Sequence, residues 1–255
     1  MFWRRRYPKY KRYQSVWQRM MNLAPWIKWT IRVFLMLIVL DIYYVSTIWP
    51  DWDKYTAGPV PKSNFIRKYQ ADYRREGWPP LQWKPVPYDE MPKYLQRAVV
   101  VAEDSRFWQH SGFDLIAFKE AMDVNISERR FAFGASTISQ QTVKNLFLTP
   151  SRNPLRKWHE LLITWGMEKN LKKSRILELY LNIAEFDLGV YGVEAAAQHY
   201  WGIPARQLNL DQAVALAASL PSPRKNNPRT RTDAFQRRVD KINGWLMPLM
   251  EEGDE

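Results

Sequence analysis

The sequence predicts a mainly α-helical domain that follows a single transmembrane helix. Three observations support this fold class. An almost continuous apolar run occupies residues 33–49. From Met91 onward, apolar residues recur at helical spacing between clear glycine and proline breaks, a pattern typical of amphipathic helices. No convincing series of alternating apolar and polar residues indicates strands, apart from short pieces before Met91.

Basic residues are concentrated at the N-terminus. Residues 1–32 hold nine of the 38 Lys and Arg residues and no acid, and taking these away leaves 29 basic against 26 acidic residues. The net charge of +12 is therefore mostly a property of a basic tail, residues 1–32. A nucleic-acid-binding domain would more often carry its basic patch on the folded body, so we expect no nucleic-acid partner.

The apolar run at 33–49 reads as a transmembrane anchor. Its 17 residues are near the short end for a spanning helix. Because basic residues lie only before it, the tail is expected in the cytoplasm and the body outside. Asp41 interrupts the run and should pair, protonate or lie near the far interface. A buried amphipathic helix is the alternative, and a cleaved signal peptide is disfavoured by the bulky residues that follow. The tryptophans that flank the run, as interfacial aromatics do, are Trp26, Trp29, Trp49 and Trp52.

Residues 50–90 contain seven prolines and several aromatics, which favours an extended lead-in without long helices. The domain itself is assigned to residues 91–255, where the pattern becomes helical. The ranges predicted as helices are 92–105, 114–125, 136–147, 154–171, 173–184, 192–200, 210–220 and 232–250.

Residues 134–145 read GASTISQQTVKN. Ser136 is a candidate N-cap, and Gly134 allows a tight entry into the helix. A stripe of hydroxyl and amides that ends in one ammonium suits a sugar joined to a phosphate. A plain solvated face is the alternative. The residues that share this helical face are Thr137, Gln140, Gln141 and Lys144.

Two glutamates are candidate catalytic groups. Glu103 ends a helix whose preceding turn is apolar on all sides, so burial should raise its pKa and suit it as a general base. Glu160 follows Arg156 by four residues, which gives either a weak intrahelical ion pair or a charged pair facing a cleft. The stripe expected to face the core of that helix is Leu155, Trp158, Leu162 and Trp165.

Other site chemistries are disfavoured. The three histidines, His110, His159 and His199, do not pair at metal-binding spacing, and the chain has no cysteine. No phosphate-binding glycine loop is present, and no placed His and Asp support a serine nucleophile.

Taken together, these segments resemble the peptidoglycan glycosyltransferases of family 51, in particular their monofunctional, membrane-anchored biosynthetic transglycosylases. All five family motifs occur in order over about a hundred residues. The matching stretches are EDSRFWQHSGFD (103–114), GASTISQQTVKN (134–145), RKWHE (156–160), KSRILELYLN (173–182) and GVYGVEAAAQHYW (189–201).

The resemblance implies a lysozyme-like fold and the polymerisation of lipid II into β-1,4-linked glycan with inversion. Glu103 matches the catalytic base, and Glu160 matches the second catalytic acid near the donor pyrophosphate. No cofactor is expected to bind tightly, although a divalent cation (Mg²⁺ or Mn²⁺) is expected near Glu160. The matched substrate-binding positions, the first three of them supporting positions of the first motif, are Asp104, Phe107, His110, Thr137, Gln141, Lys144, Asn145, Arg156 and Lys157.

The implied partners are lipid II, the growing glycan chain, the bacterial inner membrane and proteins of cell division or elongation. The domain is expected on the periplasmic side. Residues 113–133 match a jaw that touches the membrane, and their apolar side chains are expected to contact bilayer or polyprenyl chain. Two alternatives stay open at this point: a lytic transglycosylase or lysozyme-like hydrolase, and an inactive scaffold for cell-wall assembly.

Overall fold

The computed structural model describes residues 24–127, 136–150 and 154–251, and the chain divides into two compact units, 1–49 and 50–255. In the first unit, helix α2 runs from Pro25 to Ile48. It begins well before the predicted residue 33, because Pro25 suits the first helical turn and no breaker follows it. Its 24 residues extend about 36 Å at 1.5 Å per residue. That exceeds the roughly 30 Å of a bilayer core.

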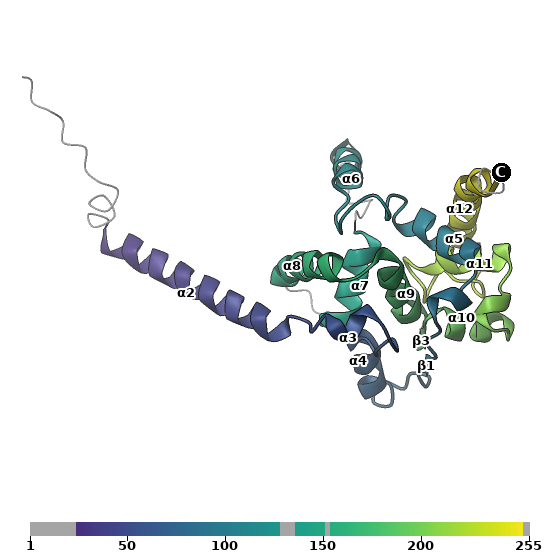
Figure 1. Ribbon diagram of the computed structural model, residues 1–255, viewed down its shortest axis with the longest axis horizontal. Helices are drawn as coiled ribbons and strands as arrows, with labels where there is room; N and C mark the ends of the chain where they lie inside the picture. The colour runs from purple at the N-terminus through teal and green to yellow at the C-terminus, as the bar shows by residue number, and fades with distance from the viewer. Residues whose placement is uncertain (1–23, 128–135, 151–153, 252–255) are drawn as a thin grey trace, which may run out of the picture. The chain divides into compact units, whose positions relative to one another are not determined.

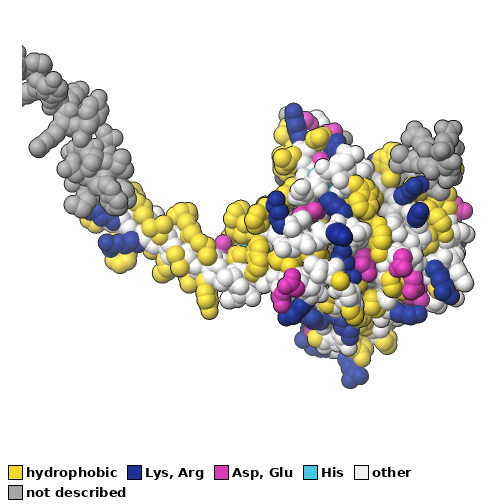
Figure 2. Space-filling view, viewed as in Figure 1, with side chains coloured by type: hydrophobic (Ala, Val, Ile, Leu, Met, Phe, Trp, Pro, Cys, Tyr) yellow, Lys and Arg dark blue, Asp and Glu magenta, His cyan; other side chains and the backbone are white. Residues whose placement is uncertain are grey.

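Helix α2 has the surface of a membrane-spanning segment. Its side chains are mostly apolar and exposed, and Figure 2 shows hydrophobic side chains along most of its visible face. Three hydroxyl groups within it, on Thr30, Ser46 and Thr47, donate to backbone carbonyls one turn earlier, at 2.6–2.9 Å. Among the described residues, α2 is the one helix long and apolar enough to cross a membrane.

Trp52 departs from its expected role beside the membrane. It is only 8% exposed, and its ring meets that of Phe147 edge to face at 5.8 Å. Tyr55 packs on the same phenylalanine at 5.0 Å. The aromatic residues that follow the anchor therefore belong to the core of the second unit.

The second unit is mainly helical, and all eight helices predicted after Met91 are confirmed with each end within two residues. Helix α7 packs on α4, α8 and α9, while α5 packs on α11 and α12 (Figure 1). The elements are α3 (Asp53–Thr56), α4 (Asn64–Asp72), β1 (Gln82–Trp83), η1 (Tyr88–Glu90), α5 (Lys93–Glu103), α6 (Leu115–Ser127), α7 (Ile138–Phe147), α8 (Pro154–Asn170), α9 (Lys173–Ile183), β2 (Glu185–Asp187), β3 (Val190–Tyr191), α10 (Val193–Trp201), η2 (Ala205–Gln207), α11 (Leu210–Ser219) and α12 (Asp233–Glu251).

A small sheet joins the lead-in to the rest of the domain. Its strand order is β1-β3-β2, with β1 parallel and β2 antiparallel to β3. Strands β2 and β3 were not predicted, because two or three residues are too few to show an alternating pattern. The tight return between them passes through Gly189, and Gly192 follows β3 as the N-cap of α10, both at positive φ.

Residues 50–90 are part of the folded domain rather than a separate segment before it. The side-chain amide of Asn182 donates to the Val86 carbonyl at 2.9 Å, and its oxygen accepts from the Val86 N–H at 2.8 Å. Arg175 donates to the carbonyls of Tyr55 and Gly58 at 2.8 and 2.9 Å. The compact unit therefore begins at Pro50 and not at Met91.

Candidate active site

Glu103 is the last residue of α5, and its carboxylate is held between two other helices. Gln141 Nε2 on α7 donates to Oε2 at 2.9 Å, and Arg238 Nη2 on α12 donates to Oε1 at 2.6 Å. The side chain is 10% exposed. Burial raises the pKa of Glu103, and the hydrogen bonds from Gln141 and Arg238 and the nearby charge of Lys144 oppose that rise. The raised pKa expected from the apolar turn before Glu103 is therefore found.

Tyr180 fixes the orientation of Gln141. Its hydroxyl donates to Gln141 Oε1 at 3.3 Å, which directs the amide nitrogen toward Glu103. Tyr180 is 1% exposed, and burial raises its pKa well above the usual range, so the hydroxyl keeps the proton that it donates. The amide therefore presents an N–H, rather than its oxygen, to the carboxylate.

Asp104 joins the first motif to the start of α7. Its two oxygens accept from the Ile138 N–H and from His110 Nε2, each at 2.9 Å. His110 Nδ1 accepts from the Gly112 N–H at 3.1 Å, so Nε2 is the protonated nitrogen. Gly112 has φ +95°, and a Cβ there would lie 2.9 Å from Thr164 Cγ2. Asp104 and His110 therefore support the site by holding the first motif against α7. Position 112 requires glycine, because its φ is positive and a Cβ would clash.

Phe107 also supports the first motif from within. It is fully buried, its ring packs edge to face on Trp108 at 5.0 Å, and Lys173 Nζ lies 4.4 Å from the ring centroid. A side chain with no exposed surface does not reach substrate in this structure. Its position fits the supporting role that the motif implies.

The first turn of α7 is built differently from the sequence expectation. Thr137, not Ser136, is the N-cap, and it forms a capping box with Gln140. Thr137 Oγ1 also donates to the Gly112 carbonyl at 2.7 Å. Thr137 and Gln140 are 3% and 6% exposed, so half of the expected polar stripe is internal structure. Gly134 lies outside the described residues.

The second half of that stripe remains available to a ligand. Gln141 and Lys144 are both partly exposed, as is the neighbouring Asn145. Burial lowers the pKa of Lys144, and Glu160 and Glu103 raise it. Within the described residues, no carboxylate lies within 4.0 Å of the Lys144 ammonium. Lys144 is therefore a cation that feels the charge of both candidate acids without forming an ion pair with either.

Glu160 is held by two cations of its own helix. Arg156 Nη1 contacts Oε2 at 3.1 Å, and Lys157 Nζ contacts Oε1 at 2.5 Å. The Glu160 side chain is 3% exposed. Lys157 Nζ also lies 3.4 Å from Ser136 Oγ, which links α8 to the entry of α7. The ion pair between Arg156 and Glu160 that the sequence offered as one reading is present.

The face of α8 predicted to be apolar and buried is instead exposed. Leu155, Trp158 and Trp165 are 55%, 48% and 55% exposed. The residues of α8 that face inward are His159, Glu160, Ile163, Thr164 and Met167. The helix therefore carries apolar residues on both faces, and it packs on α7 with Ile163 and Met167 buried beside Glu160 and Thr164.

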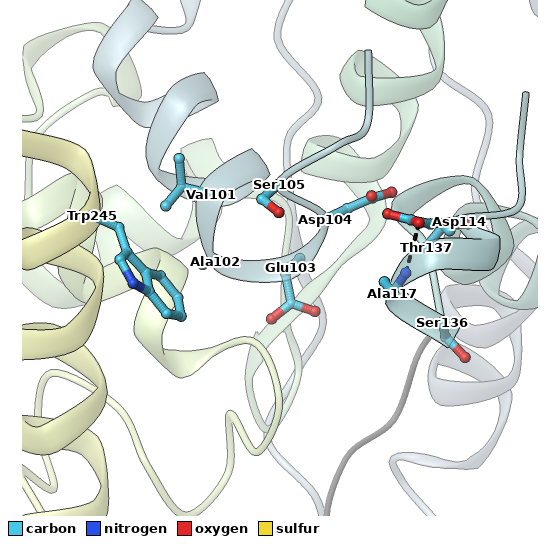
Figure 3. Close-up of a pocket in the computed structure, with 10 residues that line it drawn as sticks. All are labelled: Val101, Ala102, Glu103, Asp104, Ser105, Asp114, Ala117, Ser136, Thr137 and Trp245. Atoms are coloured by element: carbon cyan, nitrogen blue, oxygen red, sulfur yellow. Dashed lines mark hydrogen bonds between the residues drawn. The ribbon is translucent and has the colours of Figure 1, made fainter. Parts of the chain in front are cut away.

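A cavity of about 170 Å³ opens at Glu103. In Figure 3 the Glu103 carboxylate points into it, with Ser136 and Thr137 on one side and the Trp245 indole on the other. Lys144, Arg156 and Glu160 do not line this cavity. The lining residues are Val101, Ala102, Glu103, Asp104, Ser105, Asp114, Ala117, Ser136, Thr137 and Trp245.

The described residues do not offer a good metal site. Donor atoms of Asp104, His110 and Asp114 lie within 4.8 Å of one another. However, Asp114 already accepts from Arg106 Nε and the Ala117 N–H, each at 2.8 Å, and the Asp104 oxygens are occupied as described above. Both oxygens of Glu160 contact cationic side chains, which a divalent ion would have to displace.

Three residues described above were not predicted as site residues: Tyr180 on α9, and Arg238 and Trp245 on α12. Arg238 lies 135 residues from Glu103 in the chain. Helix α12 was predicted as a helix, but its periodicity carries no information about which acid it faces. No signal within one sequence could have found this pairing.

The fold and site together define a class: a mainly helical enzyme with a partly desolvated glutamate in a cavity and a cluster of cations on two other helices, α7 and α8. The family model for the transglycosylase domain matches residues 76–245. The chain belongs to this transglycosylase family, and the lysozyme-like, mainly α fold class predicted from the sequence is confirmed.

Similar proteins cover most of the chain. A biosynthetic peptidoglycan transglycosylase of Nitrosospira multiformis is 37% identical over 86% of this chain and 96% of its own length. One from Bordetella avium is 42% identical over 78% of this chain and 85% of its own. One from Thiobacillus denitrificans is 44% identical over 65% of this chain and 72% of its own.

Proposed function

We propose that this protein is a peptidoglycan glycosyltransferase that polymerises lipid II into β-1,4-linked glycan strands. The reaction inverts the anomeric carbon and releases undecaprenyl pyrophosphate. The observation that carries the proposal is the Glu103 carboxylate, partly desolvated at a cavity and oriented by Gln141 and Arg238. Family membership and the names of the relatives support the same reaction.

Glu103 acts as the general base. It takes the proton from the 4-hydroxyl of the acceptor sugar as that oxygen attacks the anomeric carbon of the donor. The bond from that carbon to the pyrophosphate oxygen breaks in the same step, and the pyrophosphate leaves with its lipid. A raised pKa makes Glu103 a stronger base, and the hydrogen bond from Arg238 keeps the carboxylate in place for the transfer.

The cations on α7 and α8 interact with the leaving group. Lys144 has no ion-pair partner in the described part of the chain, so its ammonium is available for pyrophosphate oxygens. Arg156 and Lys157 converge on Glu160 next to it. Positive charge fixed before the reaction stabilises the negative charge that develops on the leaving oxygen. The divalent cation expected near Glu160 stays a prediction, and no step is derived through it.

The alternative functions explain fewer of the residues found at the site. A lytic transglycosylase or hydrolase has no pyrophosphate to bind and no need of the cluster around Lys144. An inactive scaffold has no need of a buried, hydrogen-bonded carboxylate, which costs free energy to desolvate.

One experiment separates these functions. Purified protein is incubated with labelled lipid II, with and without Mg²⁺ or Mn²⁺, in parallel with Glu103→Gln. We expect lysozyme-sensitive polymer from the wild type and a rate about a thousandfold lower from the variant, because general-base catalysis contributes roughly 10²–10⁴-fold. Shortening of preformed glycan would instead indicate a lytic enzyme, and inactivity of both proteins a scaffold.

Helix α2 fits a single-pass membrane anchor. We propose that it lies in the bacterial inner membrane with the N-terminus cytoplasmic and the catalytic domain periplasmic. Proteins of cell division or elongation are the proposed partners there. Reporter fusions at each end of the chain test the orientation, and a periplasmic N-terminus would contradict it.

Helix α6 is the proposed second contact with lipid. Leu115, Ile116, Phe118 and Ile126 are 76%, 60%, 54% and 68% exposed, which is unusual for one helix of a soluble domain. Phe131 and Phe133 lie outside the described residues. We expect residues 50–255 to float with liposomes, and Ile116→Ser with Phe118→Ser to float several-fold less. Met247→Ser, at an exposed residue of α12, is the control. Equal flotation of all three proteins would contradict a role for α6.

A further inference from the structure

Helix α12 presents two side chains to the catalytic end of α5. Arg238 and Trp245 are seven residues apart, which places them on one helical face. Arg238 Nη2 donates to Glu103 Oε1 and, at 3.0 Å, to the Ala102 carbonyl. Ile242 and Leu246 are 1% and 0% exposed and anchor the helix in the core. The position of Trp245 beside Glu103 is therefore set by a firmly packed helix.

Trp245 forms an apolar wall of the Glu103 cavity. Its indole lies beside Val101 and Ala102, on the side of Glu103 away from Asp114 (Figure 3). The side chain is 46% exposed, so part of the ring surface is available to contact a ligand. Lys241 Nζ lies 4.6 Å from the ring centroid, a cation–π contact that restrains the indole.

The lining of the cavity has two chemical characters. Trp245 and Val101 are apolar, whereas Glu103, Ser136 and Thr137 are polar. A pyranose ring has the same division, because its faces carry C–H groups and its edge carries hydroxyls. Aromatic faces are electron-rich and attract such weakly positive C–H groups. Pockets for small ligands commonly combine an apolar wall with a few polar groups that fix orientation.

We propose that Trp245 is the stacking wall of the acceptor subsite, against which the uncharged amino-sugar ring of the acceptor packs so that its hydroxyl meets Glu103. This inference rests on the proposed function and names a substrate contact within it. The charged residues that line this cavity are acids and not cations, so the lining disfavours the pyrophosphate of a substrate. An acceptor sugar carries no charge at the ring that reacts, which matches an apolar wall.

The test separates acceptor binding from catalysis. The full-length protein in detergent micelles extends a preformed, lipid-linked, labelled glycan while the concentration of lipid II is varied. We expect Trp245→Ala to raise KM for lipid II about tenfold and to leave kcat within about twofold. A tenfold change corresponds to about 1.4 kcal/mol, which is typical of losing one aromatic contact. Trp245→Phe should recover most of the loss. Trp165→Ala, at a similarly exposed tryptophan outside the cavity, is the control.

A second measurement does not depend on turnover. Saturation-transfer NMR with the free disaccharide of N-acetylglucosamine and N-acetylmuramic acid should give a signal with wild type that Trp245→Ala loses. If Trp245→Ala unfolds on heating well below wild type, Trp245→Leu takes its place, and its KM must still rise. An unchanged KM in an active, folded variant overturns the proposal and leaves the proposed function intact. No glycan extension by wild type overturns the function itself, and the NMR signal then decides the subsite.

Discussion

The two candidate catalytic glutamates lie in regions of the domain that are built by opposite means. Glu160 on α8 receives both of its cations from its own helix, three and four residues away. Glu103 on α5 receives its partners from α7 and α12, which are 38 and 135 residues away in the chain. The difference suggests that the charge cluster is a local property of one helix, whereas the base depends on the whole tertiary fold.

Among variants that keep both glutamates, the largest effect should come from removing Lys144, the cation that has no ion-pair partner in the described part of the chain. We expect Lys144→Ala to lower kcat for polymerisation about a hundredfold, because it removes one preorganised charge near the leaving group. Initial rates with labelled lipid II measure this effect.

Gln140→Ala is the matched control on the same helix. It breaks the capping box of α7, so it should cost about 1 kcal/mol of stability, measured by thermal unfolding, and leave the rate within about threefold. Equal loss of rate in both variants would mean that Lys144 has no role beyond the structure of α7.

A smaller effect should come from removing the long-range partner of the base. Arg238 lowers the pKa of Glu103 against the rise caused by burial. In Arg238→Gln that pKa should rise further, so the carboxylate is ionised only at higher pH. Since a base works only when ionised, the acid limb of the pH profile of kcat/KM should move to higher pH.

Lys157→Gln serves as the comparison for this pH profile. It changes a cation of Glu160 and leaves every contact of Glu103 described above in place, so its acid limb should stay where it is in the wild type. A shift of the limb to lower pH in Arg238→Gln, or equal shifts in both variants, would contradict the separation of the two regions.

The sequence predicts what local spacing determines. The helices after Met91 follow from periodicity and breakers, and the contact between Arg156 and Glu160 follows from their four-residue separation. The burial of Glu103 follows from the apolar turn before it. Each of these properties is set within one or two helical turns, where a single sequence carries the information.

The sequence does not predict what packing between distant segments determines. The short strands, the outward-facing tryptophans of α8 and the contact of Arg238 with Glu103 all depend on which faces meet. Helix α8 shows the reason most directly. Its outward face carries Leu155, Trp158 and Trp165. Its buried face combines Ile163 and Met167 with Glu160 and Thr164, so apolar residues occur on both faces and their spacing alone does not select the buried one.

The contact between α5 and α12 also affects when the site is completed during synthesis of the chain. A ribosome adding roughly 5–20 residues per second needs on the order of ten seconds to synthesise the 135 residues between Glu103 and Arg238. During that interval the nascent chain already carries the acid but lacks both the arginine and the tryptophan that complete its surroundings. The growing chain therefore completes the surroundings of Glu103 only when helix α12 has been made and packed.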